Sequence, residues 1–260
     1  MDVYTFDPHL YLRRIVVVGL GGTGSHLARN LARLLVHCRQ NRQSVPELVF
    51  VDPDIVEEKN IGRQLFIPAE LGQPKAVALA RRYNYALGLE IQAICEPLNA
   101  EKHIGRNDLI CGCVDNHHAR REIARAEGHT WIDAGNDFDN GQVVIGNNSD
   151  WDAVFRGLEY GREKHSSVLP NAGLLFPSLL EAEEQAEEVD NQLSCAELVA
   201  RGEQHLYIND FMANLVTHYV YQLLNREAIT SFVSFVNLKP CVSVRNTLFT
   251  RDNLETYRRC

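Results

Sequence analysis

A glycine-rich turn constrains the fold of this chain more than any other feature. Residues 15–18 are Ile-Val-Val-Val, and Gly19, Gly21 and Gly24 follow them at G-x-G-x-x-G spacing. Residues 25–36 then carry leucines at three- and four-residue intervals, which predicts a helix with one buried face. At such a turn glycine permits a sharp bend, close approach of a phosphate to the backbone, and packing of helix on strand. The N–H groups and dipole at the helix start favour an anion, so the turn predicts a nucleotide site without specifying its chemistry.

Composition limits the classes of protein to consider. The chain has 260 residues, of which 45% are hydrophobic and 23% charged, as in soluble globular proteins. A net charge of −8 argues against non-specific binding to nucleic acid or to an anionic membrane surface. No signal peptide and no apolar run of about 18 residues is present. Seven cysteines without disulfide-like spacing favour a reduced, cytoplasmic location.

A second aliphatic run, residues 48–51, predicts the next strand and ends in Asp52-Pro53-Asp54. In nucleotide-binding sheets an acid at the carboxyl end of the second strand holds ribose hydroxyls. A polar segment with Asn60, Arg63 and Gln64 comes next, followed by Lys75 at the start of a predicted helix, residues 76–87. Each of these residues alone suits a solvated loop, but the whole set after a matching glycine turn indicates a functional cluster.

The middle of the chain predicts a further strand, from residue 108, that ends at Asp115, with a helix over residues 117–126 behind it. Because the carboxyl ends of parallel strands face the ligand crevice, Asp115 belongs near the glycine turn. Magnesium prefers carboxylate oxygens, with phosphates and water completing its shell. Arg120 suits a structural salt bridge.

The rest of the chain has a less regular pattern. We expect strands at residues 130–135 and 141–146, a long amphipathic helix at 208–223, closing strands at 230–236 and 240–249, and an arginine-rich surface segment at 251–260. The apolar stripe of the long helix suits either the core or a dimer interface. The acidic run at 181–188 suggests a solvated helix face or loop, with a docking surface for a basic partner as the alternative.

The polar cluster resembles the ATP-binding signature of the ThiF/MoeB/HesA superfamily, whose members adenylate ubiquitin-like proteins. That signature has an aspartate after the second strand, an Asn-x-x-Arg-Gln cluster and a lysine shortly after, as at Asp52, Asn60, Arg63, Gln64 and Lys75. The resemblance covers about residues 13–245. Local phrases, such as those at residues 60–66, 112–115 and 191–195, are similar to the ThiF family of the bacterial PRTRC system.

This resemblance implies an α/β fold with a Rossmann-like mixed sheet, in which a parallel first half is followed by antiparallel strands and helices cover both faces. It implies one adenylation domain over residues 1–260. Residues 1–145 would form the nucleotide-binding half, and residues 146–260 a flexible crossover segment, the long helix and the closing strands. The substrate would be a small ubiquitin-like (β-grasp) protein, and the enzyme a homodimer.

The resemblance also implies roles for individual residues, with ATP and Mg²⁺ as cofactors. Arg63 and Lys75 would neutralise charge on the phosphates, and Asp115 would hold magnesium. Asp52 would bind the ribose. The full set of expected nucleotide-binding residues is Gly19, Gly21, Gly22, Gly24, Asp52, Asp54, Asn60, Arg63, Gln64, Lys75 and Asp115.

Three details of the family pattern are open in this chain. Cys195 is the candidate for a thioester with the activated substrate, because a following helix could lower its thiol pKa; an ordinary part-buried cysteine is the alternative. Cys111 and Cys113 suit the core. No CxxC pair occurs, so no structural zinc site is expected. The phosphate-binding arginine that relatives supply from the other subunit cannot be assigned.

Two other functions stay possible at this point. An NAD-dependent oxidoreductase would explain the glycine turn and Asp52. It leaves several of the other candidate residues without a role: Asn60, Arg63, Gln64, Lys75 and Asp115. A non-catalytic nucleotide-binding subunit would explain the missing arginine and zinc cysteines.

Overall fold

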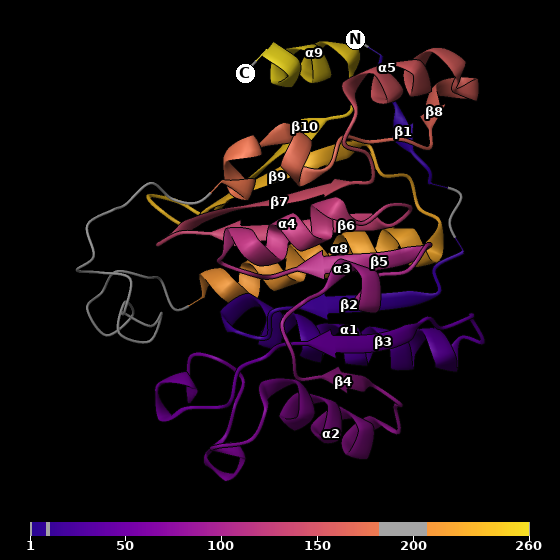
Figure 1. Ribbon diagram of the computed structural model, residues 1–260. Coiled ribbons are helices and arrows are strands. Elements are labelled where there is room, and N and C mark those ends of the chain that lie inside the picture. The colour runs from indigo at the N-terminus through magenta and orange to yellow at the C-terminus, as the bar shows by residue number, and fades with distance from the viewer. Residues whose placement is uncertain (1, 9–10, 182–206, 260) are drawn as a thin grey trace.

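An eight-stranded mixed sheet forms the centre of the computed structural model, which describes residues 2–8, 11–181 and 207–259 (Figure 1). The strand order is β10-β9-β7-β6-β5-β2-β3-β4. Their bounds are β2 Arg14–Val18, β3 Glu47–Val51, β4 Gln92–Ile94, β5 Asp108–Gly112, β6 Thr130–Asn136, β7 Asn140–Gly146, β9 Ser231–Asn237 and β10 Ser243–Leu248. A short second sheet pairs β1 (Thr5–Phe6) with β8 (His165–Ser166).

The pairing changes once along the large sheet, from parallel to antiparallel. β2 lies between β3 and β5 and runs parallel to both, and β4 and β6 extend the parallel part on either side. β7, β9 and β10 then pair antiparallel in succession. The parallel strands β2 and β5 are almost wholly buried because both of their faces are covered. The predicted fold class, a parallel first half followed by antiparallel strands, is confirmed.

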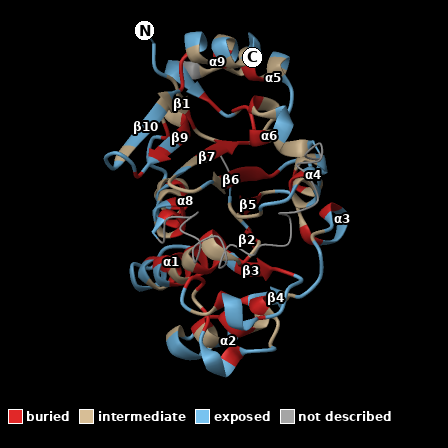
Figure 2. Ribbon diagram, turned by 90° about the vertical axis from the view of Figure 1, so that its left-hand side faces the viewer, coloured by how far each residue is buried: buried red, intermediate tan, exposed pale blue. Residues whose placement is uncertain are grey.

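Helices cover both faces of this sheet (Figure 2), as predicted. α1 and α8 lie on one side and α3, α4 and α6 on the other. Their bounds, with those of the remaining helices, are α1 Gly22–Gln40, α2 Lys75–Leu87, α3 Ala100–His103, α4 His117–Arg125, α5 Trp151–Tyr160, α6 Ala172–Leu175, α8 Ile208–Asn225 and α9 Arg251–Arg259. In the part of the chain described, no helix is both long and apolar enough to cross a membrane.

The apolar stripe of α8 packs within its own chain. Ile208, Met212, Val216 and Val220 are fully buried, and the helix contacts α1 on one side and β6 and β7 on the other. Of the two uses that the sequence allowed for this stripe, core packing accounts for these residues. Phe211, on another face of the helix, is 37% exposed.

Several elements differ from the sequence prediction. α1 begins at Gly22, inside the glycine motif, and continues to Gln40 because Cys38 is buried and extends the apolar face. The predicted surface segment at 251–260 forms helix α9 over Arg251–Arg259, which is mostly exposed and buries Leu254. β4 has only three residues, and a strand this short is decided by its pairing with β3 more than by its own sequence.

Candidate nucleotide-binding site

A cavity of about 870 Å³ lies at the carboxyl ends of β2, β3 and β5 and reaches the β6–β7 hairpin and β9. This is the edge at which open α/β sheets bind their ligands. Most of the residues predicted from the sequence line it together: Gly19, Gly21, Gly22, Asp52, Asp54, Asn60, Arg63, Gln64, Lys75 and Asp115. Among these predicted residues the largest separation in sequence is 96 positions, from Gly19 to Asp115.

The glycines of the turn have different structural tasks. Gly19 has φ +82°, a left-handed conformation that favours glycine, and its N–H donates to Val51 across the sheet at 3.0 Å. Gly21 and Gly22 line the cavity. Gly24 does not: a Cβ there would lie 1.8 Å from the Gly19 carbonyl oxygen. Gly24 thus allows α1 to pack on β2, while the two middle glycines open the turn toward a ligand.

Asp52 is fixed by the backbone on both sides of the cavity. One carboxylate oxygen accepts the Leu20 N–H, and the other accepts the Asp54 N–H at 2.8 Å. Burial raises the pKa of Asp52, while Lys75 and these two hydrogen bonds oppose that rise. A buried carboxylate held this firmly joins the end of β3 to the glycine turn.

Lys75 begins α2 and is buried with its charge paired. Its Nζ lies 2.9 Å from Asp54 Oδ2, and its backbone N–H donates to the Asp54 carbonyl at 2.9 Å. The Lys75 side chain is 8% exposed, whereas that of Asp54 is 63% exposed. The ion pair therefore holds the ammonium group at the cavity wall, with the Asp54 carboxylate nearer to solvent.

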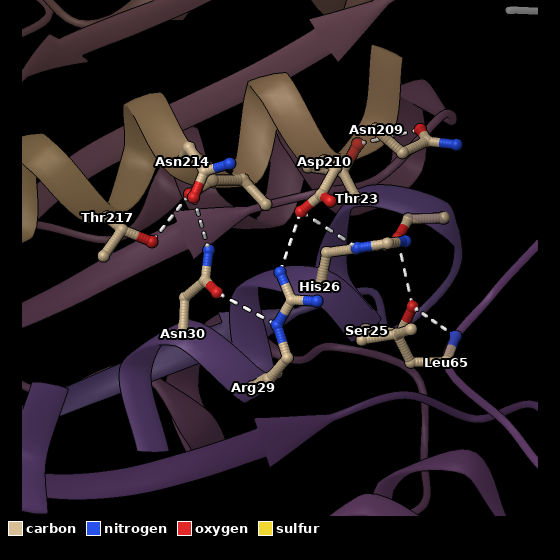
Figure 3. A network of polar contacts seen from close by, with 12 residues as sticks. Thr23, Ser25, His26, Arg29, Asn30, Leu65, Asn209, Asp210, Asn214 and Thr217 are labelled. Carbon is tan, nitrogen blue, oxygen red and sulfur yellow. Dashed lines mark hydrogen bonds and ion pairs between the residues drawn. The ribbon is translucent and has the colours of Figure 1, made fainter. Parts of the chain in front are cut away.

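Arg63 is a buried cation at the cavity wall. Only 7% of Arg63 is exposed, and its Nε has no hydrogen-bond partner among the described residues. Burial lowers the pKa of Arg63 to about 10, and the charge of Asp115 partly opposes this effect. A guanidinium that lacks solvent and close partners is suited to bind an anion. Nearby, Ser25 Oγ accepts the Leu65 N–H at 3.1 Å and ties the following backbone to α1 (Figure 3).

Asn60 and Gln64 line the same wall. Asn60 Oδ1 accepts the Glu57 N–H at 2.8 Å, so its oxygen caps the short 3₁₀ turn Glu58–Asn60. Gln64 Oε1 is buried without a hydrogen-bond partner among the described residues. Gln64 Nε2 lies 3.8 Å from the position that a Cβ on Gly21 would take. Gln64 therefore stands directly against the glycine turn.

Comparison with known proteins gives this geometry a family. The ThiF family model matches residues 9–256. The chain belongs to the ThiF family. It is similar to ubiquitin-like modifier-activating enzyme 5 of Oryza sativa (30% identity over 141 residues, 46% of this chain and 31% of the relative). It is also similar to the SAMP-activating enzyme E1 of Haloferax volcanii (32% over 123 residues, 44% and 42%).

Solved structures agree on the fold of this ThiF family chain. PaaA superposes with a TM-score of 0.58 over 91% of this chain and 64% of its own, at 17% identity. E. coli MccB, crystallised with ATP, superposes with a TM-score of 0.57 over 93% and 65%, at 15% identity. Identities this low show the fold alone. The chain spans less than half the length of these curated relatives and just under two thirds of these solved chains.

Arg120 and Cys113 of the ThiF family chain line the cavity, whereas Cys111 lies in the core beneath it. Arg120 Nε lies 3.2 Å from Asp133 Oδ1, and both side chains are buried, so the expected structural salt bridge is present. Cys111 is fully buried, and burial raises its pKa to about 12. Cys113 was also expected in the core, but it follows β5 and is only partly buried at the cavity wall.

The sequence patterns did not predict the polar residues that α1, α8 and the β6–β7 hairpin bring to this cavity. They include Thr23, Asn136, Gln142 and Asn209. Thr23 Oγ1 lies 3.1 Å from the amide oxygens of both Asn136 and Asn209. The sequence did contain one signal for Asn209, namely a polar residue near the start of a predominantly apolar helix. Cys195 and most of the acidic run at 181–188 lie outside the described residues.

Proposed function

We propose that this chain uses ATP to adenylate the C-terminal carboxylate of a small ubiquitin-like (β-grasp) protein. A carboxylate oxygen attacks the α-phosphorus, the bond to the leaving pyrophosphate breaks, and an acyl adenylate results. Support comes from the ThiF family match, from relatives named as ubiquitin-like modifier-activating enzymes, and from the cavity at the glycine turn.

The observation that carries this proposal is the buried guanidinium of Arg63. It lines one cavity with the glycine turn, Lys75 and Asp115, and its Nε has no partner among the described residues. A nicotinamide enzyme would use the turn and Asp52, but it gives this cation no task. The negative charge that develops on a reacting triphosphate would give Arg63 such a task.

The residues present fit ATP by their chemistry. The backbone at Gly21 has no Cβ to keep a phosphate away, and Asp52 lies at the end of β3, where nucleotide-binding sheets hold ribose hydroxyls. Arg63 and Lys75 would stabilise negative charge on the phosphates, with Asn60 and Gln64 as further polar contacts. Positioning and charge stabilisation, more than covalent chemistry, are what such a reaction requires of the protein.

Asp115 fits a magnesium ion that enters with the nucleotide. It is an exposed carboxylate at the cavity wall, and its charge partly opposes the lowering of the Arg63 pKa by burial. When bound, the ion would supply charge neutralisation to the phosphates. Asp115 would hold it through carboxylate oxygen, the ligand type that magnesium prefers.

ATP–pyrophosphate exchange in the presence of the β-grasp partner tests the proposal. Arg63→Ala and Asp115→Ala should each lower the exchange rate by about 100-fold or more, because each removes charge stabilisation in the transition state. Arg33→Ala, which removes an exposed arginine of α1, serves as the matched control and should exchange at the wild-type rate. Cys195→Ala should keep exchange and block only a later thioester step.

Other results would favour other functions. Tight NAD binding without exchange would indicate an oxidoreductase, and ATP binding without exchange with any β-grasp partner would indicate a non-catalytic subunit. Loss of exchange in Cys195→Ala would contradict the proposed division of steps.

We further propose that the chain acts as a homodimer and that its partner belongs to a PRTRC-type gene set. Equilibrium sedimentation tests the first point, and co-purification tests the second.

A further inference from the structure

The first turn of α8 brings one polar side chain to the glycine turn. Asn209 is the second residue of that helix, is only 3% exposed, and lines the cavity described above. Neither the sequence signature nor the roles proposed for the other cavity residues include it. Asn209 belongs to the C-terminal half of the chain, whereas the glycines of the turn belong to the N-terminal half.

Asn209 lies directly against Gly22. A Cβ on Gly22 would stand 2.6 Å from Asn209 Nδ2 and 2.8 Å from its Oδ1. Real Cβ atoms do not come this close to other atoms, so any other residue at position 22 would displace the amide. Gly22 thus makes room for the Asn209 side chain in addition to opening the turn.

Hydrogen bonding gives this amide a direction. Asn209 Oδ1 faces α1, 3.1 Å from the Thr23 hydroxyl, which can donate to it or to Asn136 Oδ1 at the same distance. Nδ2 points away from Thr23 (Figure 3). Among the described residues Nδ2 has no hydrogen-bond partner. Although the residue as a whole is 3% exposed, Nδ2 itself keeps some accessible surface, so this unused donor opens to the cavity beside Gly22.

Neighbouring contacts keep the first turn of α8 in place. Asp210 Oδ1 lies 2.8 Å from Arg29 Nη2 and 3.2 Å from His26 Nδ1, both on α1. Further along, Asn30 Nδ2 donates to Asn214 Oδ1 at 3.1 Å. The Asp210 contacts and Thr23 hold the Asn209 amide before any ligand arrives, so little ordering remains to be done on binding.

We propose that Asn209 Nδ2 donates a hydrogen bond to the phosphate chain of the bound nucleotide. The inference rests on the proposed ATP site. It adds a neutral donor from the C-terminal half to a phosphate site built otherwise by the N-terminal half. Asn209 is therefore a specificity residue for phosphorylated over unphosphorylated adenosine.

Binding measurements on the full chain with magnesium test this role without any substrate protein. ATP affinity is measured by calorimetry and adenosine affinity by ligand-observed NMR. Asn209→Ala should weaken ATP binding by about 10- to 100-fold, the loss typical of a hydrogen bond to a charged group. Asn209→Asp keeps the size and the acceptor for Thr23 but puts negative charge beside the phosphates, so it should weaken ATP at least as much. Adenosine affinity should change less than about threefold.

Asn214→Ala is the matched control, because it removes the same side chain from the same helix interface outside the cavity. It should bind both ligands as the wild type does. Parallel losses of ATP and adenosine affinity in the Asn209 variants, or ATP affinity within threefold of wild type, would overturn the inference. Because Asn209→Asp is isosteric, it decides the matter if Asn209→Ala does not fold. A wild-type chain that binds no ATP would refute the proposed function itself.

Discussion

Burial lowers the pKa of both Arg63 and His129, with different consequences for the charges of the two side chains. Arg63 keeps its charge despite a pKa lowered to about 10, so at neutral pH it faces the cavity as a cation. His129 precedes β6, is 7% exposed, and its Nδ1 has no hydrogen-bond partner among the described residues. Burial lowers the pKa of His129 to about 4, so it is neutral in the folded protein.

We predict that His129 makes stability fall as pH drops from 6.5 toward 4. In this window the unfolded chain binds a proton at residue 129 that the folded chain does not. Proton binding therefore stabilises the unfolded state relative to the folded state. The difference in pKa corresponds to about 3 kcal/mol of unfolding free energy over the whole window. His129→Gln should flatten the profile by about that amount in urea titrations at pH 7 and 4.5.

His165→Gln is the control for this experiment, because the His165 side chain is exposed. Its profile should follow the wild type. Equal pH dependence in wild type and His129→Gln would show that other groups cause the loss at low pH.

At the scale of elements, the β2–turn–α1 unit combines folding and binding in one short segment. Gly19 and Gly24 are needed for the chain to turn and for α1 to pack, since each would place a Cβ within 3 Å of backbone atoms. Gly21 is different: a Cβ there would meet no atom closer than 3.8 Å. The structural and ligand-facing requirements of the motif therefore fall on different glycines.

Alanine substitutions should separate these two requirements. Gly24→Ala should lower the unfolding free energy by at least about 3 kcal/mol, because a backbone contact of 1.8 Å cannot relax by side-chain movement. Gly21→Ala should stay within about 1 kcal/mol of wild type, the usual range for a change at a helix N-cap. We expect it to weaken ATP binding, because the added methyl group lies at the cavity wall. Chemical denaturation and ATP titration measure both effects.

A stable Gly24→Ala protein would contradict the packing role assigned to that residue. A Gly21→Ala protein that binds ATP with wild-type affinity would show that no phosphate approaches the turn at that position.

At the scale of the whole molecule, the cavity is assembled from both ends of the sequence around a rigid sheet centre. β2 and β5 lie in the middle of the sheet and are buried on both faces, whereas β10 is an edge strand with several exposed side chains. Loss of side-chain packing should therefore lower the unfolding free energy much more near the centre of the sheet than at that edge.

Ile110→Ala in β5 should lower the unfolding free energy by about 3–4 kcal/mol, because the side chain is fully buried and a cavity would remain. Val244→Ala in β10 should change it by no more than about 0.5 kcal/mol, since Val244 is 46% exposed. Urea denaturation of the two variants provides the comparison. Similar losses in both would mean that the edge of the sheet is as tightly packed as its centre.

Local pattern was enough to predict the first half of the fold and most of the cavity. The aliphatic runs of β2 and β3 and the glycine spacing are short-range signals. The carboxyl ends of parallel strands must meet at one edge, so Asp52 and Asp115 could be placed together before the structure was known. The polar segment with Arg63 and Lys75 joins that edge because it directly follows β3.

Other features depend on contacts between distant segments, and only the tertiary structure decided them. Asn209 reaches Gly22 and Thr23 because α8 packs on α1, across 186 positions of sequence from Thr23. Arg120 could be assigned a salt bridge, but its partner Asp133 could not be named without the pairing of β5 with β6. A helical pattern in sequence specifies a buried face, and the packing of that face on a particular neighbour is set by the shape of the whole core.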